Sequence, residues 1–163
     1  LNSEFNFSLD AAANDDNHLA PLYYTADNDA LSNDWRMDMD FQSACLNTKP
    51  KNYNVWCNPP YGRGYIQKFM EKAIEQKEKG VTTVMLVPAT LDAQWLPINE
   101  VSEIRMVTGG RLSFMHPVTG KKIAGNTKGS VFIIFSPSKS PLTTKYISRE
   151  ELLEKGKSIL PSG

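Results

Sequence analysis

The 163-residue sequence contains little of the chemistry on which metal sites and disulfide frameworks depend. It has two cysteines, Cys45 and Cys57, and two histidines, and none of them stands at a metal-ligand or disulfide-framework spacing. No apolar run approaches the roughly 20 residues of a membrane span, and the sequence shows no signal-peptide pattern. We therefore expect one globular domain in a reducing cytoplasm, without a metal and without a membrane.

A net charge is also lacking, because 18 basic and 18 acidic side chains cancel, and this at first argues against a DNA-binding protein. The charges are unevenly distributed, however. Residues 1–60 hold nine acidic and three basic side chains, a net charge of −6, and residues 61–163 hold 15 basic and nine acidic ones, a net charge of +6. Either the second part meets phosphates, or the asymmetry is that of an ordinary solvated surface. The basic residues on or beside the predicted site loops are Arg63, Arg105, Arg111, Lys121, Lys122 and Lys128.

The most distinctive stretch is 55–61, Val-Trp-Cys-Asn-Pro-Pro-Tyr. Its first three residues are typical of a short buried strand. Pro59 and Pro60 then end the strand, because each proline fixes φ at about −65° and donates no backbone N–H. The sequence therefore predicts a rigid corner just past the C-terminal end of a strand, which is where open α/β sheets bind ligands.

The residues of this corner suit a planar group that carries an amine. The side-chain oxygen of Asn58 and the carbonyl of Pro59 can both accept from one –NH₂ group, and Tyr61 can stack on the ring. Two acceptors on one exocyclic amine localise the nitrogen lone pair and make it a better nucleophile without a formal base. The predicted catalytic residues are Asn58, Pro59, Pro60 and Tyr61.

The pattern of apolar residues predicts an α/β domain with a mostly parallel sheet that ends in an antiparallel hairpin. The expected strands lie at 7–11, 22–25, 55–57, 81–87, 103–107 and 131–135. The apolar face of a helix that Gly80 ends consists of Ile66, Phe69, Met70, Ala73 and Ile74. The last two strands form the hairpin, joined by a basic, glycine-rich loop at 115–129. We expect a loop at 36–54 and a linker at 136–141, and Ser148 with Glu151 fits the capping box of a short C-terminal helix.

Asn58-Pro59-Pro60-Tyr61 resembles the catalytic motif of amino-methyltransferases that use S-adenosyl-L-methionine. Segments 7–13, 23–25, 29–35 and 110–114 occur with it in order, and the whole set resembles the phage-type DNA N6-adenine methyltransferases, the Dam family, over roughly residues 1–135. The helix and Thr-Pro segment usual ahead of this point in the family are absent here. We therefore expect a methyltransferase domain at 1–136 that lacks an N-terminal segment, followed by a linker and short helix at 137–163.

The resemblance implies a Rossmann-like, S-adenosylmethionine-dependent domain, with S-adenosyl-L-homocysteine as product. The expected reaction transfers a methyl group to N6 of an adenine flipped out of double-stranded DNA. The expected setting is the host cytoplasm, for a phage or prophage protein. The alternatives are transfer to cytosine N4 or to a protein glutamine, and a catalytically silent nucleotide- or DNA-binding module. The predicted DNA contacts are Arg63, Arg111, Lys121, Lys122 and Lys128.

The predicted cofactor contacts come mostly from acidic and small residues. Asp10 can accept from the ammonium group of the cofactor, and the small Ala11 and Ala12 let its methionine part approach the backbone. The alternative for Asp10 is a helix N-cap. Asp27 stands where acids reach ribose hydroxyls in α/β nucleotide sites, although a turn residue is an equal interpretation and Asp29 competes for the role. The resemblance places Asp34 near the adenine of the cofactor, with a helix cap as the alternative. The full predicted set is Asp10, Ala11, Ala12, Asp27, Asp34 and Asn58.

Overall fold

The structure is a computed structural model. It describes residues 1–60, 64–89, 96–109, 114–115, 122–123, 129–138 and 141–157.

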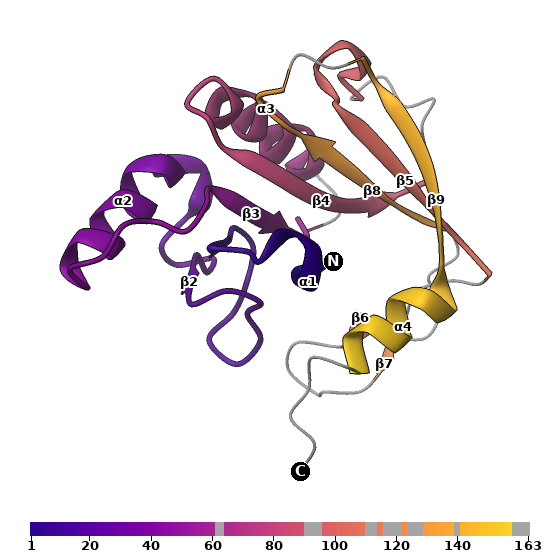
Figure 1. Ribbon diagram of the computed structural model, residues 1–163, viewed down its shortest axis with the longest axis horizontal. Coiled ribbons are helices and arrows are strands. Elements are labelled where there is room, and N and C mark those ends of the chain that lie inside the picture. The colour runs from indigo at the N-terminus through magenta and orange to yellow at the C-terminus, as the bar shows by residue number, and fades with distance from the viewer. Residues whose placement is uncertain are drawn as a thin grey trace.

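A seven-stranded sheet in the order β2-β1-β3-β4-β8-β5-β9 forms the centre of the domain (Figure 1). The strands are β1 (Leu9–Asp10), β2 (Leu22–Tyr23), β3 (Asn54–Cys57), β4 (Thr82–Pro88), β5 (Glu103–Thr108), β8 (Ser130–Phe135) and β9 (Thr143–Ser148). Strand β8 runs antiparallel to both of its neighbours, and every other pair in the sheet is parallel. The parallel strands therefore all end at one edge of the sheet, which we call the C-terminal edge.

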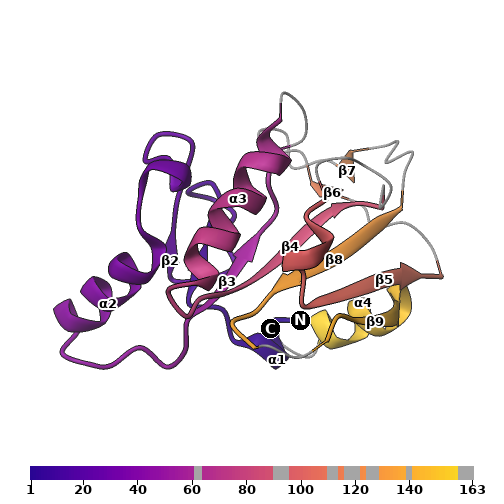
Figure 2. The same ribbon diagram turned by 90° about the horizontal axis from the view of Figure 1, so that it is seen from above.

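Helices cover both faces of this sheet (Figure 2). The helices are α1 (Asn2–Phe5), α2 (Trp35–Cys45), α3 (Tyr65–Lys77) and α4 (Arg149–Lys157), with 3₁₀ turns η1 (Ala30–Ser32) and η2 (Ile98–Glu100). Residues of α2 and α3 pack on the first face, and residues of α1 and α4 pack on the second. A separate two-stranded sheet pairs β6 (Phe114–Met115) with β7 (Lys122–Ile123). Across the described ranges, no helix is both long and apolar enough to cross a membrane.

The core follows from the apolar pattern of the sequence. Strands β4 and β8 are buried over nearly their whole length, as expected for central strands covered on both faces. Helix α3 buries Phe69, Met70 and Ala73 on its predicted apolar face, and it ends three residues before Gly80, whose φ of +85° suits glycine. The predicted pairing of 103–107 with 131–135 is confirmed, because β5 and β8 are antiparallel neighbours.

The predicted loop at 36–54 is wrong, because α2 occupies residues 36–45 of this segment. Asp34 caps the start of the helix, and its side chain accepts from the Met37 N–H at 3.0 Å. Only Trp35 and Met39 are buried, one turn apart, and the other side chains are largely polar or exposed. Two buried positions make a weak helical period, and this is why the segment resembles a loop in the sequence.

The C-terminal segment holds more structure than a linker and a helix. Strand β9 extends the sheet beside β5, and α4 follows it directly. The first four residues of β9 are exposed, so the strand shows no alternation, although Thr143, Thr144 and Ile147 are β-branched residues that favour strands. The predicted helix cap is confirmed, since Ser148 Oγ accepts from the Glu151 N–H at 3.0 Å.

Candidate active site

The proline corner lies where the sequence predicts it, at the C-terminal edge. Strand β3 pairs with β1 on one side and β4 on the other, and its last residue, Cys57, is fully buried, which raises the pKa of the thiol. Pro59 is buried and Pro60 is exposed. The half-buried side chain of Asn58 has no hydrogen-bonding partner in the part of the chain that the structure describes. Its amide is therefore available to a ligand. Tyr61 lies outside the described residues.

The end of β1 lies directly beside this corner. Asp10 is opposite Trp56 in the register, and the Ala11 N–H donates to the Trp56 carbonyl at 2.8 Å. The Asp10 carboxylate accepts from the Ala12 N–H at 3.2 Å and from the Leu19 N–H at 2.9 Å. It is only 3% exposed, and this burial raises its pKa despite the two backbone hydrogen bonds. Asp10 therefore closes the loop from Ala11 to Leu19. The sequence does not predict this role, because the donors are backbone N–H groups, which every non-proline residue carries.

The acidic residues beyond β2 differ in whether their carboxylates already accept hydrogen bonds from the protein. Asp29 caps η1, accepting from the Leu31 N–H at 3.1 Å and from Ser32 Oγ at 2.6 Å. Asp27 is exposed and has no partner among the described residues. Of the two candidates for a ribose contact, Asp27 is thus the one whose oxygens are available.

Asp34 takes the helix-cap role that the sequence left open. Besides the Met37 N–H, its carboxylate binds the ammonium group of Lys79. Partial burial disfavours the charged form, but the hydrogen bonds from Lys79 and Met37 outweigh it and lower the pKa of Asp34. Both oxygens are therefore engaged within the protein. The predicted contact of Asp34 with the cofactor adenine stays a prediction.

The basic residue Arg105 does not line a site loop. It lies on β5 with only 7% of its surface exposed, and its guanidinium binds the carboxylates of Glu4 and Glu103. The sequence predicts Arg105 on or beside the site loops, and the structure corrects this: Arg105 belongs to a buried ion-pair network. Two nearby carboxylates offset the cost of burying its charge.

Four of the five predicted DNA contacts belong to the segment between β5 and β8, and the structure describes both ends of this segment. Strand β5 ends and β8 begins at the C-terminal edge, and the Ala89 N–H donates to the Gly129 carbonyl at 2.9 Å. The segment between them therefore leaves and re-enters the sheet on the side of the proline corner. Lys122 belongs to β7, but its side chain is outside the described part. The other four predicted contacts lie outside the described residues: Arg63, Arg111, Lys121 and Lys128.

Two further observations concern other possible binding sites in the described structure. An apolar cavity of about 220 Å³ lies on the second face, between Trp56 and Leu152, and its apolar lining does not suit a charged cofactor. Within the described ranges, no group of three or more His, Cys, Asp or Glu residues could hold a metal ion. Among the predicted site residues that the structure describes, Asn58 and Asp27 have polar side chains available to a ligand, and both belong to loops at the C-terminal edge.

The arrangement defines a class of protein. A mostly parallel sheet with one antiparallel strand inserted between β4 and β5, and a proline corner beside the loop that follows β1, is a Rossmann-like methyltransferase fold.

The comparisons with known proteins agree with this class. The chain belongs to the family of DNA N-6-adenine-methyltransferases (Dam), whose model matches residues 1–159. It is 31% identical to the DNA N-6-adenine-methyltransferase of Escherichia phage T1 over 144 residues, covering 78% of this chain and 54% of the phage protein. It is 28% identical to the DNA N-6-adenine-methyltransferase of Haemophilus phage HP1 over 156 residues, covering 92% and 80%.

Two consequences follow from these matches. The chain spans about half the length of the T1 relative. The family match also extends past residue 135, the limit expected from the sequence motifs, and so includes β9 and α4.

Proposed function

We propose that this chain transfers a methyl group from S-adenosyl-L-methionine to N6 of an adenine flipped out of double-stranded DNA. The observation that carries the proposal is the half-buried Asn58 amide, which has no partner in the described part of the chain and stands on a rigid corner at the ligand-binding edge of the sheet. Membership of the Dam family supports the same reaction.

The residues after β1 and β2 fit the cofactor. Ala12 is half-buried, and its small side chain would let a ligand approach the backbone there, next to Ala11, which is itself only 1% exposed. The available Asp27 carboxylate could accept from ribose hydroxyls. Asp10 shapes this loop and, with Asp34, completes the proposed set of contacts. Bound S-adenosyl-L-methionine would supply an electrophilic sulfonium methyl group and leave as S-adenosyl-L-homocysteine.

The corner would hold and activate the adenine. The Asn58 side-chain oxygen and the Pro59 carbonyl accept from the N6 amine, which localises its lone pair as the new bond forms. Tyr61 stacks on the extruded base, and together these contacts offset the few kcal/mol that base flipping costs. Asn58 is an amide and takes no proton, so the proton lost from the methylated nitrogen passes to water.

The basic residues would bind the DNA backbone. We assign Arg63, Arg111, Lys121, Lys122 and Lys128 to phosphate contacts, because the loop that holds the last four leaves and re-enters the sheet at the edge that carries Asn58. Because the relatives are phage proteins, we place the reaction in the cytoplasm of the bacterial host.

A methylation assay on two duplexes tests the reaction. One duplex offers adenine and the other only cytosine as an amine acceptor in the modified strand, and the products are digested and identified by mass spectrometry. We expect N6-methyladenine from the first duplex and no N4-methylcytosine from the second. Methylated cytosine would favour the cytosine-N4 alternative. Cofactor binding without transfer to either duplex would favour a protein glutamine acceptor or a silent binding module.

A further inference from the structure

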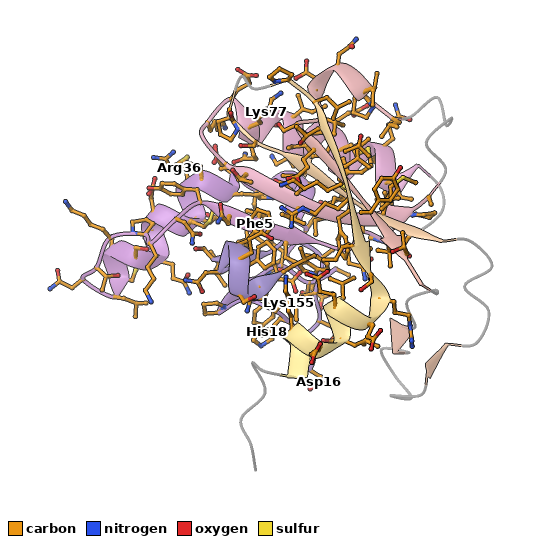
Figure 3. The ribbon with its side chains drawn as sticks, turned by 45° about the vertical axis from the view of Figure 1, so that its right-hand side comes forward. Phe5, Asp16, His18, Arg36, Lys77 and Lys155 are labelled. Carbon is orange, nitrogen blue, oxygen red and sulfur yellow. The ribbon has the colours of Figure 1, made fainter. Side chains whose placement is uncertain are left out.

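Arg105 connects two segments that are far apart in the sequence. Its Nη1 and Nη2 atoms donate to the Glu4 carboxylate at 2.5 and 2.7 Å, across 101 residues, and its Nε donates to Glu103 at 3.1 Å. The guanidinium carbon also lies 5.3 Å from the ring centre of Phe5, which Figure 3 labels. A buried arginine on the second face of the sheet therefore holds the N-terminal arm, residues 1–8.

The arm is held at a second point, at the start of β3. The Asn54 Nδ2 donates to the Phe5 carbonyl at 2.6 Å, and Asn52 Nδ2 donates to the Asn6 carbonyl at 3.0 Å. Strands β3 and β5 are separated by β4 and β8, a distance of about 14 Å at the usual strand spacing. The arm thus spans the second face between Arg105 on one side and the asparagines on the other.

The arm also contacts both elements that carry the proposed site. The Phe7 ring lies 5.6 Å from Trp56, and Trp56 lies 6.1 Å from Phe132, so aromatic contacts run from the arm to the residue two before Asn58. The arm continues directly into β1, which ends at Asp10. A displacement of the arm would therefore shift the loop after β1 most. It would shift the corner less, because the two prolines hold the corner rigid.

We propose that Arg105 is a positioning residue for cofactor binding, acting through Glu4 and the N-terminal arm on the loop from Ala11 to Leu19. This inference rests on the proposed function, because it assigns that loop to S-adenosyl-L-methionine. It does not place Arg105 in contact with the cofactor, since the side chain is buried on β5 and bound to two carboxylates.

The network allows a mild test from the exposed side. Side-chain exposure is 51% for Glu4 and 14% for Glu103, and Glu103 also binds Lys145 at 3.1 Å. In Glu4→Gln, Arg105 keeps Glu103 as its partner, so no buried charge is left alone. In Arg105→Met, Glu103 keeps Lys145. Neither variant therefore carries the full cost of an unpaired buried charge.

The experiment measures KM for S-adenosyl-L-methionine and kcat for wild type, Glu4→Gln, Arg105→Met, Arg105→Lys and the double variant Glu4→Gln/Arg105→Met. Glu78→Gln, an exposed glutamate after α3, is the matched control. We expect Glu4→Gln and Arg105→Met to raise KM at least about tenfold, equivalent to about 1.4 kcal/mol. We expect kcat to change by less than about threefold, the control to stay unchanged, and Arg105→Lys to be intermediate because lysine keeps one ion pair.

The double variant shows whether the two residues act together. If Arg105 acts through Glu4, the double variant has the KM of Arg105→Met alone, because its partner is already lost. A lower thermal midpoint with an unchanged KM in both single variants would show a purely structural role and overturn the inference. Additive effects of the two substitutions on KM would show that Arg105 does not act through Glu4.

The failure of this inference is distinguishable from failure of the proposed function. Calorimetric titration with S-adenosyl-L-homocysteine measures cofactor binding without the reaction. A wild-type chain that neither methylates nor binds would refute both. A wild-type chain that methylates, with variants of unchanged KM and unchanged binding, would refute only the role of Arg105. A chain that binds but does not methylate still tests Arg105 through the dissociation constant.

Discussion

The corner at Asn58 and the network around Arg105 belong to the same sheet, yet their polar groups are in opposite states. Asn58 is half-buried and has no hydrogen-bonding partner in the described part of the chain. Arg105 is more deeply buried, and Glu4 and Glu103 both accept from its guanidinium. Asn58 therefore keeps hydrogen-bonding capacity for a ligand at the ligand-binding edge. Arg105 is held between two carboxylates and can act on the site only through the segments that it positions.

The same contrast separates the acidic residues near the site. Asp29 and Asp34 look from sequence like candidates equal to Asp27, but each caps a helix. Asp10 closes a loop through two N–H groups. Only Asp27 among these four has an exposed carboxylate with no partner in the described residues. The comparison thus predicts that the available groups contact ligands directly, and that the paired groups act through the stability or the position of the segments that they hold.

The largest expected effect comes from Asn58→Ala. Removal of one acceptor from the developing charge lowers kcat about 10²–10³-fold, by analogy with the loss of a stabilising contact in other active sites. The free energy of unfolding changes by less than about 0.5 kcal/mol, because the amide loses no partner among the described residues. Turnover with S-adenosyl-L-methionine and urea unfolding measure the two quantities. Asn99→Ala, at an exposed position in η2, is the control. Near-full activity in Asn58→Ala would break the comparison.

The next effect concerns a paired group on the first face. Gln76 is fully buried on α3, and its Oε1 accepts from the Arg36 N–H at 3.0 Å. Gln76→Ala leaves a cavity and an unpaired N–H, and it lowers the free energy of unfolding by about 2–4 kcal/mol. KM and kcat at a temperature where the variant is folded stay unchanged. Gln67→Ala, exposed on the same helix, should cost less than about 0.5 kcal/mol. A change in kcat without a loss of stability would contradict the assignment.

A smaller effect depends on pH. Burial raises the pKa of Asp10, against the two backbone hydrogen bonds, so the folded state holds the Asp10 proton more tightly than the unfolded state does. Its contribution to stability is complete below the unfolded pKa, close to 3.8, and is lost as the pH rises through the higher folded pKa. In Asp10→Asn this loss is absent, so the variant and wild type differ in the slope of unfolding free energy against pH in that window. Urea unfolding across the window measures the slope, and a wild-type stability that rises there more than that of the variant would contradict the sign.

The smallest effect is expected at Tyr53, before β3. The Tyr53 hydroxyl donates to Asp40 at 2.5 Å, and the Arg36 guanidinium lies 3.6 Å from the ring centre. Tyr53→Phe keeps the ring and removes one hydrogen bond, so the free energy of unfolding falls by no more than about 1 kcal/mol. Thermal unfolding measures the change. A loss of activity would show that this paired group also supports the site.

Local features of the fold could be predicted because they depend on neighbours within a few residues. The two prolines after Cys57, the apolar face of α3, the buried runs of β4 and β8, and the Ser148 cap all follow from the sequence. The same reasoning missed α2, because only two of its residues are buried, and β9, because its first four residues are exposed. Both elements depend on contacts that a short stretch of sequence does not contain.

The sequence by itself determined the chemistry that this protein can offer: an amide on a rigid proline corner, small residues after the first strand, and the motifs of its family. Only the tertiary structure decided which polar groups remain available. Arg105 finds Glu4 across 101 residues, and Asp34 binds Lys79 across 45, because the sheet order brings distant segments together. A side chain's residue type sets the hydrogen bonds that it can make, but its partners are set by what folds against it.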